Sequence, residues 1–168
     1  GDDGTGSGRL AVPSSGPIQF RGPIRPDQDN TRSNGTSDYR WSVVYAGTGT
    51  INTSDAREKQ QVRELLEAER NVAIKLKGLI RAFKFNDAVD SKGEGARIHF
   101  GVMAQDVADT FTEEGLNPHD YAMFCYDEWE ETPEELDTDG TVITPYRSAG
   151  NRYGVRYEEL LAFVISTM

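Results

Sequence analysis

A regular pattern of apolar and polar positions begins at Ser54 and predicts the longest element of the chain. From Ser54 to about Phe83 almost every residue favours helix, and Asp55 and Glu58 stand three apart, the spacing of a capping box. The pattern predicts one helix over 54–83, which either packs on its own domain or supplies the seam of a coiled coil. Its apolar side chains recur at the helical period, at Val62, Leu65, Leu66, Val72, Ala73, Leu76, Leu79, Ile80 and Phe83.

The residues before Ser54 follow a different pattern. Residues 1–9 have the composition of a flexible linker. From Leu10 to Thr53, short apolar runs are broken by Gly, Pro, Asn and Asp, which predicts short strands joined by turns. A segment with so few large apolar side chains can hardly bury a core of its own. We therefore expect 10–53 to associate with other chains or to continue a longer fibrous protein.

The residues after Phe83 predict an α+β fold. Asn86-Asp87 and the polar run Asp90–Gly95 predict a loop, and the segment 127–139 holds eight acids in 13 residues, which predicts a solvated loop or arm. The sequence therefore predicts a β-rich N-terminal segment, followed by a mixed α/β domain that begins with a long helix. The remaining predicted elements are strands at 96–100, 121–126, 142–143 and 153–157, helices at 102–111 and 158–165, and a turn at 150–151.

Composition changes at the same position as the apolar pattern. Residues 1–53 are neutral, with five Asp and five Arg, whereas 54–168 carry the whole net charge of −10. The chain has no cluster of Lys and Arg to attract nucleic acid and no apolar run long enough to span a membrane. The single Cys125 cannot form an internal disulfide, and the two His are isolated. We therefore expect no metal site and no cofactor.

One pair of side chains at this boundary could carry catalysis. Lys59 follows Ser54 by five residues, little more than one helical turn. A Ser hydroxyl becomes a nucleophile when a base takes its proton, and Lys can be that base where burial disfavours its charged form. The carbonyl of Thr53 adjoins Ser54, so the pair could attack the chain's own peptide bond. The alternative is that Ser54 caps a helix and Lys59 is a solvated charge.

Three motifs, Thr53–Lys59, Arg97–Val107 and Tyr153–Leu160, follow one another along the chain. In this order they resemble the endosialidase-type intramolecular chaperone of bacteriophage tail spikes and tail fibres. The resemblance covers 54–168 nearly end to end. The preceding segment, Pro26–Thr53, is similar to the β-stalk ends that these phage proteins place before the chaperone.

The resemblance implies a domain that trimerises, guides the folding of an intertwined triple-stranded β-stalk and then cuts itself off. By match to the family's Ser-Asp-x-x-x-Lys motif, Ser54 is the implied nucleophile, Lys59 its general base, and Thr53–Ser54 the scissile bond. The same matched motifs hold the further site or interface residues Asp55, His99 and Gln105, with a buried structural role as the alternative for His99.

The resemblance also implies partners, domains and location. Residues 10–53 would be the end of a trimeric stalk, and 54–168 the chaperone. The partners would be two further copies of the chain, the upstream stalk and, through the stalk, a host-surface polysaccharide. The stalk would belong to the virion tail, and the chaperone part would be released in the host cytoplasm.

Two other functions are compatible with the residues. The chain could be a structural or carbohydrate-binding trimeric fibre tip without cleavage, in which Tyr39, Trp41 and Tyr45 form a sugar-stacking surface. It could also be a hydrolase acting on other molecules, although the sequence carries no signature of a substrate cleft.

Overall fold

The computed structural model describes residues 17–50, 52–136 and 138–168. The chain divides into two compact units, residues 1–36 and 37–168. The predicted linker at 1–9 and the first residues of the predicted stalk, 10–16, lie outside the described residues. The predicted boundary between Thr53 and Ser54 falls inside the second unit and stays a prediction.

The described residues before Ser54 form bends, turns and extended chain instead of the predicted short strands. Most of their side chains are exposed, and the one ion pair described within 17–36 joins Asp27 and Arg32 at 3.0 Å. A strand requires a hydrogen-bonded neighbour, and none pairs with this part of the described chain. The single chain therefore forms no strand within residues 17–50, 52 and 53, and strands that pair between chains stay a prediction.

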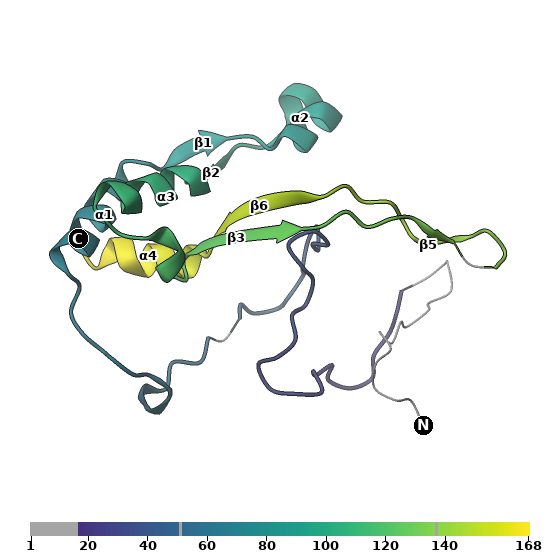
Figure 1. The fold of residues 1–168 in the computed structure, drawn as a ribbon, viewed down its shortest axis with the longest axis horizontal. Coiled ribbons are helices and arrows are strands. Elements are labelled where there is room, and N and C mark those ends of the chain that lie inside the picture. The colour runs from purple at the N-terminus through teal and green to yellow at the C-terminus, as the bar shows by residue number, and fades with distance from the viewer. Residues whose placement is uncertain (1–16, 51, 137) are drawn as a thin grey trace. The chain divides into compact units, whose positions relative to one another are not determined.

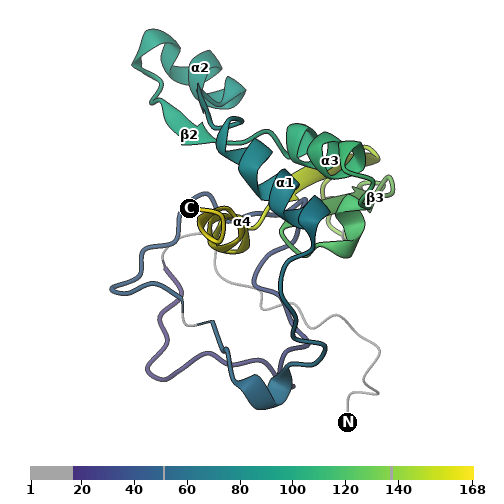
Figure 2. The ribbon, with the colours of Figure 1, turned by 90° about the vertical axis from the view of Figure 1, so that its left-hand side faces the viewer.

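Three helices build the hydrophobic core of the second unit. Helix α1 (Glu67–Lys77) contacts both α3 (Ala104–Glu113) and α4 (Tyr157–Ile165), as Figures 1 and 2 show. The helices predicted at 102–111 and 158–165 are thus confirmed. The ring of Phe111 packs against those of Tyr121 and Phe163, at centroid distances of 4.4 and 6.1 Å. The buried core side chains from these helices are Val72, Leu76, Val107, Phe111 and Leu160, each contributing about 1.5–3 kcal/mol by burial.

The long helix predicted over 54–83 is wrong, because only its centre is helical. Before α1, the residues from 54 to 66 contain a single 3-10 turn, η1 (Ala56–Glu58). After α1, the chain leaves the helix at Gly78 and forms strand β1 (Arg81–Phe83). The seam expected along the helix is also broken, since Val62 is 85% exposed.

The start of α1 is fixed by the side chain of Glu69 rather than by helix propensity. The Glu69 carboxylate, which is 3% exposed, accepts the backbone N–H of Leu66 at 2.8 Å. It also accepts two bonds from the Arg63 guanidinium, at 2.6 and 2.8 Å. The backbone of Leu66 is extended (φ −69°, ψ 161°), so the helix begins after it. Local side-chain contacts at the start of the helix therefore override the helix preference of the residues that precede Glu67.

A short hairpin carries a helix that the apolar pattern did not predict. Strand β1 pairs antiparallel with β2 (His99–Gly101), which confirms a strand near 96–100. Between them lie α2 (Asn86–Lys92) and the 3-10 turn η2 (Gly93–Gly95), where a polar loop was expected. Figure 1 shows α2 at the end of this hairpin. A helix of seven residues with no buried side chain has no apolar stripe from which it could be predicted.

The acidic segment forms one side of a two-stranded arm. Strand β3 (Phe124–Trp129) pairs along its whole length with β6 (Gly150–Val155), and Trp129 faces Gly150. This pairing overturns the turn predicted at 150–151. Beyond it, Thr132 and Arg147 form a bridge, and strand β4 (Glu135–Leu136) pairs with β5 (Val142–Thr144), the strand predicted at 142–143. The described acids of 127–139 are all exposed, as expected for a solvated arm.

The arm also contacts Asp38 and Tyr39, which lie at the start of the segment that leads to Ser54. Arg147 forms an ion pair with Asp38, and its guanidinium lies 5.5 Å from the ring centroid of Tyr39 and 5.6 Å from that of Trp129. Arg152 lies 5.4 Å from the Trp129 ring. Such contacts between a cation and an aromatic face are worth about 0.5–1 kcal/mol each at exposed sites. The arm therefore contacts the second unit's own N-terminal residues.

Candidate functional site

The structure brings the side chains of Ser54 and Lys59 together. Lys59 Nζ donates a hydrogen bond to Ser54 Oγ at 2.6 Å, across five positions of the sequence. This is the distance at which a proton can pass between a nucleophile and its base. The two residues predicted from the sequence to act as a pair are thus neighbours in space, with the carbonyl of Thr53 directly preceding Ser54.

The turn η1 produces this geometry, and Asp55 caps it. Asp55 Oδ1 accepts the backbone N–H of Arg57 at 2.9 Å, and its carboxylate pairs with the Arg57 guanidinium at 2.6 Å. The hydrogen bonds from Arg57 lower the pKa of Asp55. The backbone N–H of Lys59 then donates to the carbonyl of Ala56 at 3.2 Å and closes the turn. Asp55 therefore belongs to the site as the residue that shapes the chain between Ser54 and Lys59.

Both members of the pair are exposed in the single chain. The described hydrogen bond places Lys59 Nζ in direct contact with Ser54 Oγ. A Lys accepts a proton only when it is uncharged, and removal from water favours the uncharged form. The single chain therefore brings the predicted nucleophile and base together without shielding them from solvent.

A third residue, Glu158, contacts the chain just before the pair. Its carboxylate accepts a hydrogen bond from Thr50 Oγ1 at 3.5 Å and another from Asn52 Nδ2. Glu158 lies in the first turn of α4, more than a hundred positions further along the chain. The sequence motif Tyr153–Leu160 includes it, but no local spacing connects it with Asn52, so sequence reasoning missed this contact.

The other two predicted site residues lie on β2 and α3. His99 is exposed, which overturns the alternative of a buried structural His, and its ring packs against Phe85 at 4.9 Å and Phe83 at 6.0 Å between centroids. Gln105 is exposed in the first turn of α3. None of the hydrogen bonds described in the structure joins either residue to Ser54 or Lys59.

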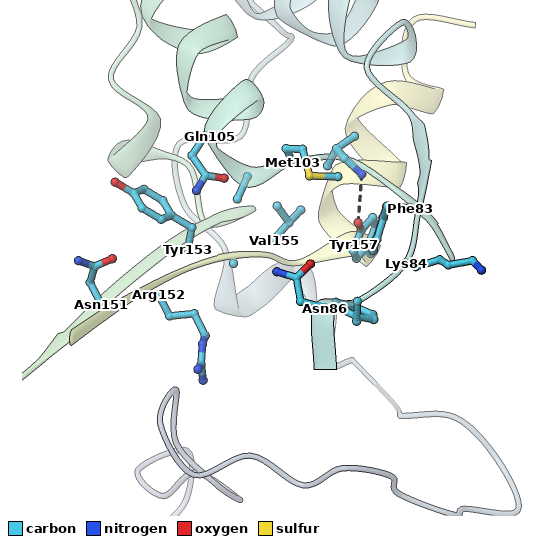
Figure 3. A pocket seen from close by; sticks show the side chains of 14 residues that line it. Phe83, Lys84, Asn86, Met103, Gln105, Asn151, Arg152, Tyr153, Val155 and Tyr157 are labelled. Atoms are coloured by element: carbon cyan, nitrogen blue, oxygen red, sulfur yellow. Dashed lines mark hydrogen bonds between the residues drawn. The ribbon is translucent and has the colours of Figure 1, made fainter. Parts of the chain in front are cut away.

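Gln105 lines an open hollow of about 610 Å³ between the hairpin, α3 and β6, shown in Figure 3. At one wall the hydroxyl of Tyr157 accepts the backbone N–H of Val102 at 3.2 Å, the dashed line of the figure. Tyr157 is also the first residue of α4, next to Glu158. This hydrogen bond ties the start of α4 to the residue that follows β2.

The fit of Tyr157 requires a glycine at position 101. A Cβ on Gly101 would lie 2.1 Å from the Tyr157 hydroxyl oxygen and 3.1 Å from its Cζ. We expect Gly101→Ala to lower the free energy of unfolding by roughly 1–3 kcal/mol, the usual cost of overpacking. Chemical denaturation measures it, with Gly95→Ala as the control because no atom lies within 4 Å of that Cβ position. An equal decrease in the free energy of unfolding in both variants would contradict overpacking against Tyr157 as the cause.

Glu69 holds the chain between the Ser54–Lys59 pair and the core. Besides Arg63 and Leu66, it accepts a hydrogen bond from the hydroxyl of Tyr121 at 3.0 Å. Together these donors, with Arg63 the largest contributor, lower the pKa of Glu69 to about 2. The acid was visible in the sequence only as a charged interruption of the expected helix seam. Its role depends on Tyr121, which lies 52 positions away.

No group of three metal-ligating side chains occurs among residues 17–50, 52–136 and 138–168. In the same described ranges, no helix has the length and apolar character that crossing a membrane requires.

Comparison with known proteins gives concordant results. The family model described as the chaperone of endosialidase matches residues 54–116. One similar solved structure is the carboxy-terminal domain of the bacteriophage T5 L-shaped tail fibre with its intramolecular chaperone domain, with a TM-score of 0.72 and 31% identity over 87% of this chain and 36% of that one. A second, of a novel intramolecular chaperone, has a TM-score of 0.61 and 40% identity over 68% of this chain and 94% of that one.

Curated relatives include much longer phage proteins. The tail spike protein of Escherichia virus K5 is 34% identical over 97% of this chain and 26% of the relative. The side tail fibre protein of Escherichia phage T5 is 32% identical over 88% of this chain and 11% of the relative. The chain therefore spans about a quarter or less of the length of these relatives.

Proposed function

The chain belongs to the chaperone-of-endosialidase family, and from this premise we propose that residues 54–168 are a self-cleaving intramolecular chaperone. Residues 10–53 are the end of the β-stalk whose folding it directs. Three copies assemble, the stalks fold together, and each chaperone then cuts the bond between Thr53 and Ser54. The observation that carries the proposal is the hydrogen bond of 2.6 Å between Lys59 Nζ and Ser54 Oγ.

The reaction needs only these two side chains and water. Uncharged Lys59 Nζ takes the proton of Ser54 Oγ while Oγ bonds to the carbonyl carbon of Thr53. The bond from that carbon to the nitrogen of Ser54 then breaks, and the nitrogen receives the proton back from Lys59. Water hydrolyses the resulting ester, which leaves a carboxylate on Thr53 and a free amino group and hydroxyl on Ser54.

Assembly of several copies provides the burial that the single chain lacks. Large apolar side chains are exposed on α1, on the hairpin and on α4, a surface expected to be covered by other protein. Covering the pair would disfavour the charged form of Lys59 and so make it a base. Cleavage would then follow assembly rather than precede it. These apolar side chains are Ile74 (56% exposed), Ile80 (54%), Phe100 (75%), Leu161 (51%) and Ile165 (61%).

The chaperone role follows from the physics of intertwined strands. Such a stalk is dominated by contacts between chains, so ordering entropy must be lost before the contacts form, and folding is slow. A domain that folds and trimerises first holds three stalk ends close together and raises their effective concentration. Once the domain has been released, the stalk cannot readily refold, so its persistence depends on its unfolding rate. Cleavage thereby makes assembly a one-way step.

Relatives that are tail spikes and tail fibres support a place for the stalk in the virion tail. The proposed partners of the chaperone are two further copies of the chain and the stalk upstream in the same polypeptide. Release of the chaperone part takes place during assembly in the host cytoplasm.

Mass analysis of freshly expressed protein tests the proposal. We expect two products from the chain, one of which begins at Ser54, and a trimeric mass for the folded assembly in light scattering. A folded wild-type chain that stays intact, or that is cut at another bond, would overturn self-cleavage. A cut product that is monomeric throughout its folding would overturn the trimeric chaperone.

A further inference from the structure

Glu158 contacts two residues just before the proposed scissile bond. Thr50 Oγ1 and Asn52 Nδ2 both donate to the Glu158 carboxylate. They precede the proposed scissile bond by three residues and one. The Glu158 carboxylate therefore binds the segment upstream of the bond, which ends in the new carboxyl terminus after cleavage.

The helix that carries Glu158 is fixed to the core. Leu160, two residues further on, is 4% exposed in the core. Tyr157 accepts the N–H of Val102 at 3.2 Å, and the backbone N–H of Arg156 donates to the carbonyl of Met123 at 2.9 Å. Three contacts from different parts of the fold thus set the position of the first turn of α4. The N-terminal end of a helix also favours a negative side chain.

We propose that Glu158 is a positioning residue for the self-cleavage described above, on which this inference rests. It holds Thr50 and Asn52 so that the Thr53 carbonyl is presented to Ser54, and it favours amide or hydroxyl donors at these two positions. Because Glu158 lies 106 positions after Asn52, the upstream side of the bond is aligned only after the chain between them has folded and α4 has packed on the core. Glu158 thereby makes cutting dependent on completed folding.

An isosteric exchange of charge tests this role. Asn52→Asp places a second carboxylate against Glu158, so we expect cleavage to slow by about tenfold or more, the scale of a lost hydrogen bond to a charged group. Adding Glu158→Gln provides an amide donor for the new carboxylate, and we expect the double variant to recover to within about threefold of wild type. Glu159→Gln, which removes a neighbouring exposed acid, is the control and should cut at the wild-type rate.

The rate is followed by pulse-chase in cell-free translation, from the appearance of the product that begins at Ser54. A merely structural role for Glu158 would not produce rescue by the exchanged pair. If wild type is cut but Asn52→Asp is cut equally fast, or if the double variant is slower than Asn52→Asp alone, the positioning role is overturned while self-cleavage stands. If wild type itself is never cut, both proposals fall.

Discussion

Ser54→Ala is expected to keep all 168 residues in one polypeptide, with cleavage slowed by at least about a thousandfold, the scale seen when a nucleophile is removed. Ala has no oxygen to bond to the Thr53 carbonyl, so no ester can form. The measurement is the intact mass of the folded chain after prolonged incubation. Because Ser54 is exposed and caps no helix in the structure, this variant should fold as wild type does.

Substitutions of Lys59 separate its role as base from its role as a charge. Lys59→Ala removes both, whereas Lys59→Arg keeps a long cationic donor that could still reach Ser54 Oγ. Guanidinium does not give up its proton in proteins and cannot accept one from Ser54. We therefore expect both variants to stay uncut, while Lys92→Ala, which changes an exposed residue of α2, is cut normally. Cleavage of Lys59→Arg at the wild-type rate would exclude Lys59 as the base.

The Ser54–Lys59 pair shows how a correct proximity can follow from an incorrect element. The sequence predicted their proximity from the rise of one helical turn, yet no α-helix connects them. A 3-10 turn followed by extended backbone at Lys59 (φ −116°, ψ 143°) gives the same proximity. The spacing of five residues was sufficient, because an α-helical turn and a 3-10 turn followed by extended backbone both bring residue 59 close to residue 54. The contact between Ser54 and Lys59 was therefore predictable, although the path of the chain between them was not.

Elements that depend on distant partners could not be predicted in this way. The start of α1 depends on Tyr121 and Arg63 around Glu69, and the full length of β6 depends on pairing with β3. By contrast, α3 and α4 have clear apolar patterns and were predicted nearly at their observed bounds. Local patterns were thus informative where a segment packs by its own apolar face. They failed where polar contacts from elsewhere decide the geometry.

Glu158 and Glu69 act at opposite sides of the proposed cleavage point. Glu158 contacts residues 50 and 52 upstream, and Glu69 contacts residues 63 and 66 downstream. Each carboxylate belongs to a helix of the three-helix core. The exposed segment that holds Ser54 and Lys59 is therefore tied to the folded core at both ends. This arrangement lets the core determine when the pair and its target are aligned.

Glu69→Gln should lower the free energy of unfolding by about 2–4 kcal/mol near neutral pH, because the Arg63 guanidinium loses its carboxylate partner and Tyr121 loses its charged acceptor. The substitution keeps the volume of the side chain, so no cavity confuses the result. Denaturation is measured in a Ser54→Ala background, in which cutting cannot change the chain. Glu113→Gln is the control, since that carboxylate is 64% exposed in its ion pair with Lys75 and should matter little.

The same pair of variants should respond differently to acid. The pKa of Glu69 is lowered from 4.5 to about 2 in the folded chain, so its contribution is complete above about pH 4.5 and is lost as the pH falls toward about 2. A shift of this size corresponds to about 3 kcal/mol. The difference in unfolding free energy between wild type and Glu69→Gln should therefore shrink across that window, while the Glu113→Gln difference stays small. A difference that stays constant from about pH 6 to about pH 2 would show that the loss arises from packing and not from the charge that anchors the start of α1.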